Sequence, residues 1–192
     1  MRNCIVVNLD RCSGCDSCIV ACKLENGIPL GEYWNRVDDI GPFGSYPEIE
    51  KYWLPVMCQQ CENPACVAVC PTGASYKDAE TGVVRITRDA CIGCKSCMMA
   101  CPYGARTFHG EDKTVYKCEL CPSVTKKGDV PACVHNCPTA ARFYGDLDDP
   151  ESDVSKELAK YEESAIFKLT DTVGVGPTTS YILSPSIATW QG

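Results

Sequence analysis

The sequence predicts an α+β fold in which two small repeated units carry an inserted β-hairpin and an extended C-terminal tail. Three observations predict it: a high cysteine content, four cysteine groups that alternate between two patterns, and two stretches without cysteine. The chain has 192 residues and 17 cysteines, about 9% of the total, which is typical of disulfide scaffolds or metal sites. The hydrophobic fraction of 45% indicates a folded protein.

Sixteen cysteines fall into four groups of fixed spacing. The groups are Cys12-x2-Cys15-x2-Cys18-x3-Cys22, Cys58-x2-Cys61-x4-Cys66-x3-Cys70-Pro71, Cys91-x2-Cys94-x2-Cys97-x3-Cys101-Pro102 and Cys118-x2-Cys121-x11-Cys133-x3-Cys137-Pro138. The third is the run of bacterial ferredoxins, where three cysteines hold one cubane and the fourth ligates its neighbour. Zinc prefers two separated C-x2-C pairs, and disulfides need an oxidising compartment. The spacing therefore favours iron–sulfur clusters over zinc and disulfides.

The groups form an internal repeat. The first and third share the pattern D-x-C-x-G-C-x-S-C, while the second and fourth share P-A-C-V followed by C-P-T-x-A. The chain is thus two ferredoxin-like units with two cluster loops each. Spacing alone leaves open which groups share ligands, and it favours the second and third groups as one unit only weakly.

Short elements are expected around the loops. Residues 5–9 and 82–87 have the composition of strands, and residues 107–108 and 114–116 predict a hairpin around Gly110. We expect a helix to start in each run between a third and a fourth ligand, at residues 19–21, 67–69 and 98–100. Because such units have thin cores, cluster ligation should supply much of their folding energy.

The two stretches without cysteine predict an insertion and a tail. In residues 23–57, strands at 32–37 and 51–56 should flank a Gly/Pro-rich loop at 41–47. This hairpin could dock another subunit or shield clusters from water. Residues 149–153 predict a helix start with proline in its first turn, and 154–161 continue the helix. Residues 170–192 lack helical periodicity and should wrap over this protein or a partner.

The remaining chemically active residues give weaker signals. Cys4 is expected to be a free buried thiol on the first strand. We expect His109 and His135 to lie at the surface or beside the ligands. Lys95 and Lys117 adjoin cysteines, where they could raise a cluster's potential or be ordinary surface lysines. No catalytic triad, phosphate-binding loop or open metal site appears, so we expect electron transfer without catalysis by this chain alone.

Charge and hydropathy limit the partners. The net charge of −7 argues against nucleic acid, which binds basic surfaces. No apolar run is long enough to span a membrane, and the N-terminus shows no export signal. The sequence therefore predicts a cytoplasmic protein without direct membrane insertion. Any membrane association or export would come through a partner.

The motifs closely resemble the four-cluster iron–sulfur subunits of the molybdopterin (dimethyl sulfoxide reductase) superfamily, notably those of polysulfide and dimethyl sulfoxide reductases. The resemblance runs from about residue 4 to about residue 157. It is carried by Ala21-Cys22-Lys23-x-Glu25-Asn26, Cys58-x2-Cys61-Glu62-Asn63-Pro64, Cys70-Pro71-Thr72-Gly73-Ala74-Ser75-Tyr76, Ala100-Cys101-Pro102-Tyr103 and Gly145-Asp146-Leu147-x-Asp149-Pro150.

The resemblance implies four [4Fe–4S] clusters and a nested pairing of loops. The implied ligand sets are set I (Cys12, Cys15, Cys18, Cys137), set II (Cys22, Cys118, Cys121, Cys133), set III (Cys58, Cys61, Cys66, Cys101) and set IV (Cys70, Cys91, Cys94, Cys97). Residues 1–22 and 103–150 would form an outer unit, and residues 58–102 an inner one. Residues 23–57 are the insertion hairpin, and residues 151–192 are the C-terminal helix and tail.

The family also implies a role. The chain would pass electrons to or from a large catalytic subunit with a molybdenum or tungsten pterin site, in an anaerobic oxidoreductase. A membrane-anchor quinone subunit completes some such complexes. The alternative is a free-standing polyferredoxin that carries electrons for enzymes such as hydrogenases. The partner's substrate and the direction of electron flow are not readable from the residues.

Overall fold

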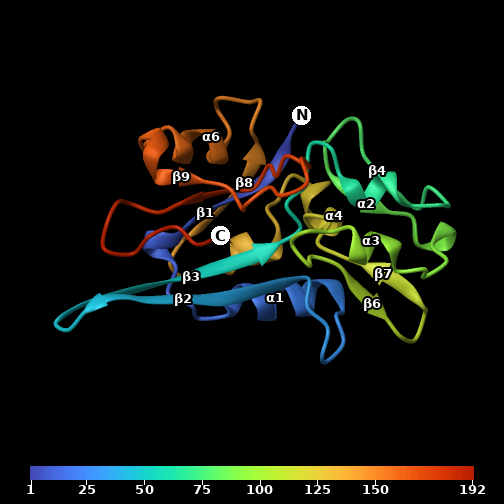
Figure 1. The fold of residues 1–192 in the computed structure, drawn as a ribbon. Helices are drawn as coiled ribbons and strands as arrows, with labels where there is room; N and C mark the ends of the chain where they lie inside the picture. Colours follow the sequence, from blue (N-terminus) through green and yellow to red (C-terminus); the bar gives the residue numbers. More distant parts are fainter.

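The computed structural model describes residues 1–192 and has short helices and small sheets in two lobes (Figure 1). The helices are α1 (Ser17–Asn26), α2 (Ala65–Ala68), α3 (Ser96–Met99), α4 (Pro122–Thr125), α5 (Ala132–His135) and α6 (Asp153–Leu158). The strands are β1 (Asn3–Asn8), β2 (Asn35–Ser45), β3 (Glu48–Met57), β4 (Ser75–Lys77), β5 (Val84–Ile86), β6 (Thr107–His109), β7 (Thr114–Tyr116), β8 (Arg142–Asp146), β9 (Ile166–Phe167) and β10 (Ser180–Ile182). The expected mixture of helices and strands is confirmed.

The cluster-loop helices begin earlier than expected. α2 and α3 already contain the third ligands Cys66 and Cys97, and both end before the fourth ligand. Each fourth ligand in these loops precedes a proline, which disfavours helical backbone at the residue before it. In α1 the fourth ligand Cys22 precedes Lys23, so that helix continues to Asn26.

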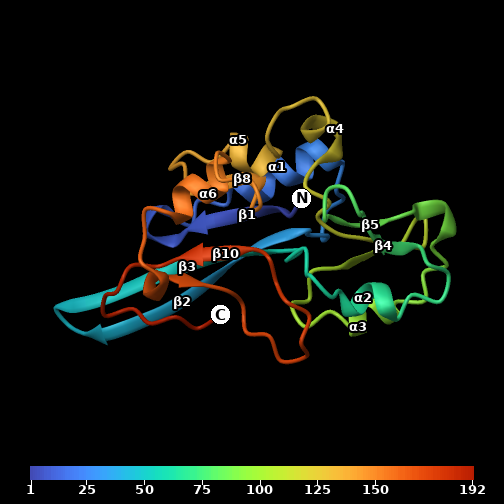
Figure 2. The same ribbon diagram turned by 90° about the horizontal axis from the view of Figure 1, so that it is seen from above.

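The C-terminal tail, expected to wrap over this protein or a partner, is part of the core of this protein. The main sheet has the order β8-β1-β10-β9, so the tail supplies an inner strand. β10 runs parallel to β1, with Val6 opposite Ser180, and β9 pairs antiparallel with its other edge. Figure 2 shows the two ends of the chain in one layer. A three-residue parallel strand has too little periodicity to be recognised in the sequence.

The insertion is the expected hairpin, but its strands are longer. β2 and β3 pair from Asn35 opposite Met57 to Ser45 opposite Glu48. The register shifts between Ile40 and Phe43, so the glycine and proline of the expected loop are absorbed as a bulge within β2. The hairpin extends away from the rest of the molecule in both views (Figures 1 and 2).

The helix of the C-terminal segment starts later than expected. The backbone N–H of Ser155 donates to the side chain of Ser152, which caps α6 at Asp153. Pro150 therefore precedes the helix, in a turn where Asp149 accepts a hydrogen bond from the Glu151 backbone. α6 packs on β8 and β1 and covers one face of the main sheet (Figure 1).

The smaller lobe holds two hairpins and two one-turn helices. The hairpins β4/β5 and β6/β7 are antiparallel, and the second confirms the predicted hairpin around Gly110. α2 packs against α3 and β4. Val115 of β7 shares a small core with Cys97, so β6/β7 lies beside α3 (Figure 1). No helix of the structure is long and apolar enough to cross a membrane.

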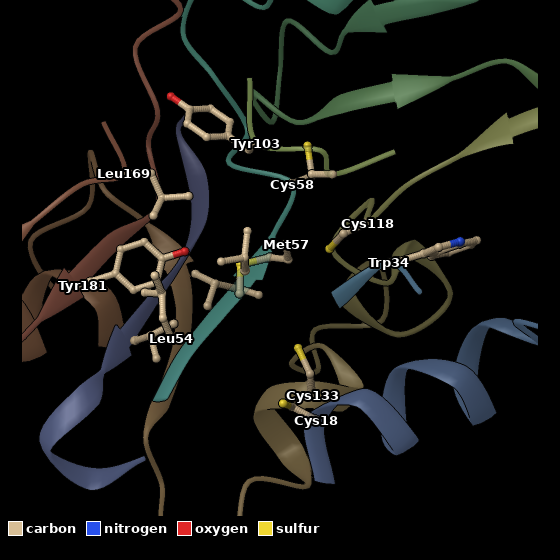
Figure 3. Packing of buried hydrophobic residues seen from close by; sticks show 14 of the residues in the cluster. Cys18, Trp34, Leu54, Met57, Cys58, Tyr103, Cys118, Cys133, Leu169 and Tyr181 are labelled. Atoms are coloured by element: carbon tan, nitrogen blue, oxygen red, sulfur yellow. The ribbon is translucent and has the colours of Figure 1, made fainter. Parts of the chain in front are cut away.

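A large core connects the lobes. It contains 23 buried residues, including Tyr181 of β10 and Met57 of β3, and it reaches the cysteine loops (Figure 3). The predicted ligands Cys18, Cys58, Cys118 and Cys133 belong to it. Each of these cysteines is therefore part of the packed interior.

Candidate cluster-binding site

Two cavities of the larger lobe match two of the expected ligand sets. All four cysteines of set I line the first cavity, with Val37 and Pro55 from the base of the β2/β3 hairpin. All four cysteines of set II line the second cavity, with Trp34 and Met57. Cys18 of α1 and Cys133 of α5 lie side by side where these helices pack (Figure 3). The helix pair thus brings the first and fourth groups together.

The cysteines of the smaller lobe gather in the same manner. Burial, together with the negative charges of the three other set III cysteines, raises the pKa of the Cys61 thiol to about 12. Burial also raises the pKa of Cys97, whose charged neighbours include Cys91 and Cys70 of set IV. The contact of α2 with α3 brings the second and third groups together.

The donor set fits clusters better than disulfides or single ions. All 17 cysteines are free, so none is bridged to another. No group of three or more Cys, His, Asp or Glu side chains is arranged to hold one metal ion. Zinc would need four ligand atoms at about 2.0–2.3 Å. Four cysteines spread around a cavity suit a cubane, whose irons are bound one per cysteine.

The repeated loops also repeat their hydrogen bonds to sulfur. The hydroxyls of Ser17 and Ser96 lie 3.5 Å from the sulfurs of Cys15 and Cys94. The backbone N–H of Ser75 donates to Cys70, and that of Ala141 donates to Cys137, at 3.3 Å each. Such bonds stabilise thiolates, and hydrogen bonds to sulfur are one determinant of cluster potential.

Exposure divides the ligands into two kinds. Cys15 and Cys94 are exposed, and their serine hydrogen bonds lower the pKa of both thiols. Cys22 and Cys118 are buried, and burial raises the pKa of Cys22 to about 12 and that of Cys118 well above its ordinary value. Buried thiols ionise only beside positive charge, which iron would supply. Sets I and IV therefore each have one cysteine at the surface.

Two functional candidates were missed by the sequence reasoning. Arg106 and Arg142 are buried among the cysteines, and the Nη2 atom of Arg106 lies 2.8 Å from the sulfur of Cys66. A signal existed, because each arginine ends a repeated segment C-P-x-x-A-R. This repeat starts at Cys101 and Cys137, the last cysteines of the third and fourth groups. It differs from the C-P-T-x-A pattern, which the second and fourth groups share.

The lysines and histidines differ in placement. Lys117 is 1% exposed, so it is no surface lysine, and its ammonium donates to the carbonyls of Val84 and Cys118. Lys95 is exposed and its ammonium lies 3.9 Å from the centroid of the Phe108 ring. Neither ammonium donates to a cysteine sulfur.

His135 and the leftover cysteine agree with expectation, whereas His109 is paired with a carboxylate. His135 is exposed, and His109 is partly buried with its Nδ1 atom 2.8 Å from the Glu32 carboxylate. Cys4 lies on β1, fully buried and away from the four sets. Burial raises the pKa of its thiol to about 12, which keeps it protonated and unreactive at neutral pH.

The hairpin insertion covers one cluster loop. Gly14 has a φ of +64°, and a Cβ there would lie 2.3 Å from Nε1 of Trp53 on β3. The ring of Trp53 therefore rests directly on the loop of set I. The far end of the hairpin is exposed, with Tyr46 at 90%. The base has the shielding geometry of a lid, while the tip is free for a partner.

Comparisons with known protein families agree with this geometry. A family model described as a 4Fe-4S dicluster domain matches residues 49–147. A second, described as a 4Fe-4S binding domain, matches residues 9–34. Together these segments contain all sixteen cysteines of the four sets.

Several curated proteins are similar along most of the chain. A sulfite dehydrogenase subunit from Allochromatium vinosum is 38% identical, covering 93% of this chain and 81% of its own. A tetrathionate reductase subunit from Salmonella typhimurium is 37% identical, covering 94% and 72%. The arsenate respiratory reductase iron–sulfur subunit from Shewanella sp. strain ANA-3 is 32% identical, covering 98% and 99%.

Proposed function

Because the chain belongs to the family of iron–sulfur electron-transfer subunits of dimethyl sulfoxide reductase-type oxidoreductases, we propose that it passes electrons through four [4Fe–4S] clusters to or from a molybdopterin catalytic subunit. The observation that carries the proposal is the gathering of sixteen cysteines into four sets around two packed helix pairs. In this role the chain performs no bond chemistry on a substrate.

The proposed ligands are the cysteines of sets I to IV. Sets I and II are supported by the cavities that their members line, and sets III and IV by the mutual electrostatic effects of their thiols. The fourth cysteine of each group crosses to the loop of its neighbour, as Cys22 does to Cys118. When bound, the clusters supply one-electron chemistry. The residues of this chain hold them apart from water and set their electrostatic surroundings.

Double substitutions test the crossed ligation. Cys22 and Cys118 belong to one proposed set, so Cys22→Ser with Cys118→Ser should cost one cluster and leave about 12 irons per chain. Cys22→Ser with Cys15→Ser removes ligands from two sets, and should leave about 8 irons. Cys4→Ser is the matched control and should leave all clusters in place. Equal iron loss in the two double variants would contradict the crossed pairing.

The proposed partner is a large molybdenum or tungsten protein. The relatives are named as subunits of two reductases and a dehydrogenase that have different substrates. Similar electron-transfer subunits therefore occur with different catalytic reactions. Native purification under argon, with molybdenum and tungsten measured on each peak, tests the partner. Co-elution of this chain with a large molybdenum or tungsten protein is the expected result. Iron and sulfide in a lone small protein would instead favour a free-standing polyferredoxin.

The exposed sets suggest where electrons enter and leave. Cys15 of set I and Cys94 of set IV are the exposed ligands, whereas the set II cysteines are all buried. Large apolar side chains are exposed beside Cys94, namely Ile92 at 66% and Met99 at 81%. Exposed apolar groups beside a cluster fit a contact with another subunit. We place the two ends of the electron path at sets I and IV.

A further inference from the structure

Two arginines are buried among the proposed ligands, one in each lobe. Arg106 is 6% exposed and Arg142 is 4% exposed. They end the repeated segments Cys101-Pro-x-x-Ala-Arg and Cys137-Pro-x-x-Ala-Arg. Arg142 is the first residue of β8, and Arg106 immediately precedes β6. The internal repeat therefore places the same buried cation at the same point of each unit.

Arg106 contacts the ligands of the smaller lobe. Its Nη2 atom donates to the sulfur of Cys66 and to the hydroxyl of Ser75, both at 2.8 Å. Its Nη1 atom is buried and has no partner within the protein. Burial acts to lower the pKa of the guanidinium, but the negative charges of Cys66, Cys97 and Cys58 raise it. Cys66 and Cys97 belong to different sets, III and IV, so one cation serves both.

Arg142 occupies the equivalent place in the larger lobe. It lines the cavity of set I and also the cavity of set II. Its Nη2 atom donates to the Asn35 amide oxygen at 2.9 Å, and its Nη1 atom is buried without a partner. Burial acts to lower its pKa, while the charges of Cys133 in set II and Cys18 in set I raise it.

Neither arginine has a carboxylate as counter-ion. The ion pairs of the structure involve other residues throughout. Arginine stays protonated at any working pH, and a buried charge without a partner is strongly destabilising. The negative groups that face each guanidinium are cysteine sulfurs of the proposed cluster sites. The cost of burying these charges is thus offset at the sites themselves.

We propose that Arg106 and Arg142 each provide one permanent positive charge shared by the two ligand sets of a pair, and that each raises the reduction potentials of both clusters in its pair. The proposal rests on the cluster-binding function proposed above. An electron that arrives from the donor subunit adds one negative charge to the pair, and that charge leaves when the electron moves on. Each guanidinium exchanges no proton and stabilises the reduced state through its charge. Arg106 adds a hydrogen bond to the sulfur of Cys66.

The test is a potentiometric titration of all four clusters, followed by electron paramagnetic resonance, on the intact complex. Arg106→Gln should lower two potentials and leave two unchanged, and Arg142→Gln should lower the complementary two. The expected change is at least tenfold in the reduction equilibrium constant, which is about 59 mV for a one-electron couple. Arg106→Lys and Arg142→Lys keep the positive charge, so the reduction potentials of these variants should stay close to those of the wild type.

Further measurements separate this proposal from simpler accounts. Iron and sulfide are measured first, and a wild-type chain without clusters would end the proposed function itself. Arg2→Gln removes an exposed arginine that pairs with Asp148, and should move no potential. Full cluster content with unchanged potentials in the Gln variants would overturn the arginine proposal alone. Loss of two clusters in both the Gln and the Lys variant would also overturn it, because the arginine would then be needed for assembly.

Discussion

Both lobes support cysteine loops, but the larger lobe does so with more secondary structure than the smaller lobe. The larger lobe supports its cysteine loops with a ten-residue helix, α1, and a four-stranded sheet. The smaller lobe uses the four-residue helices α2 and α3 and two hairpins of three-residue strands. Its own core has four buried residues, two of which are the proposed ligands Cys66 and Cys97. The larger lobe therefore relies more on ordinary packing, and the smaller lobe relies more on what its cysteines bind.

The strongest test of this difference is removal of the clusters. Metal ligation supplies folding free energy in small domains, so iron chelation under argon should unfold the smaller lobe. The main sheet should keep its slowly exchanging amides, because β1 and β10 are paired on both edges and buried. Hydrogen exchange followed by mass spectrometry measures both lobes in one sample. Equal loss of protection in both lobes would contradict this difference between them.

A large effect is also expected from the tail strand of the larger lobe. Tyr181 is fully buried, and its hydroxyl donates to the Pro55 carbonyl and accepts from the Gln59 amide. Tyr181→Ala should lower the free energy of unfolding by about 3–5 kcal/mol, the usual cost of removing a buried aromatic ring. Tyr181→Phe should cost about 1 kcal/mol, because one hydrogen-bonding group is lost.

Anaerobic denaturant unfolding of the holo-protein measures both tyrosine variants. Deletion of residues 170–192 should be more severe than Tyr181→Ala, since it removes β10 from between β1 and β9. A truncated chain with normal stability and normal iron content would contradict the structural role of the tail.

The matched glycines of the repeated loops give a smaller and sharper contrast. Gly14 and Gly93 both have φ near +65°, where a side chain costs about 1–2 kcal/mol. A Cβ at Gly14 would meet the Trp53 side chain, which can move. A Cβ at Gly93 would lie 2.1 Å from the Lys113 carbonyl oxygen, which is backbone. Gly93→Ala should therefore lower stability and iron content more than Gly14→Ala.

A second substitution sharpens the glycine contrast. Trp53→Ala should relieve part of the defect of Gly14→Ala, because it removes the clashing ring. No side-chain truncation can relieve Gly93→Ala in the same way. Thermal unfolding and iron analysis of the single and double variants decide the matter, and equal defects at both glycines would count against it.

The smallest effects are the pH dependences, which should have opposite signs in the two lobes. Burial acts to raise the pKa of Glu157 on α6, but hydrogen bonds from Lys160 and Asn8 lower it below its ordinary value of 4.5. Its stabilisation is present above pH 4.5 and is lost as the pH falls through the lowered pKa. The larger lobe should thus weaken in acid, and Glu157→Gln should reduce this dependence.

The smaller lobe should respond near neutrality. A hydrogen bond from His109 to Glu32 raises the pKa of His109 above its ordinary value of 6.5. The stabilisation is complete below pH 6.5 and is lost as the pH rises through the raised pKa. Exchange rates of the β6/β7 amides from pH 5.5 to 8.5 measure it, with His109→Gln as the control. A response of the wild type identical to that control would contradict the assignment.

The spacing of cysteines along the sequence made the cysteine loops predictable. Contacts between residues that are far apart in the sequence could not be predicted. The spacing of the cysteines along the chain identifies the four loops without a structure, but it leaves open which loops share a cluster. The parallel pairing of β10 with β1 joins residues 174 positions apart, such as Val6 and Ser180, and no local pattern encodes it. The register shift that absorbs Gly41 into β2 depends equally on the partner strand.

The electrostatics of the site were harder to predict than its ligands. Lys117 stands next to a ligand in the sequence and could be assigned to either surface or interior. Lys117 can be buried because its ammonium donates to the carbonyl oxygens of Val84 and Cys118. Arg106 and Arg142 gave a repeat signal, yet the contact of Arg106 with sulfur and the position of Arg142 in the cavities depend on the fold of the units.

The central claim is that this chain holds four cubane clusters, and elemental analysis tests it most directly. Iron, acid-labile sulfide and zinc should be measured per chain on the complex purified under argon. Four cubanes in the chain should give about 16 irons and about 16 sulfides, without zinc. About 8 of each would leave one lobe without its clusters, and zinc without sulfide would contradict the account as a whole.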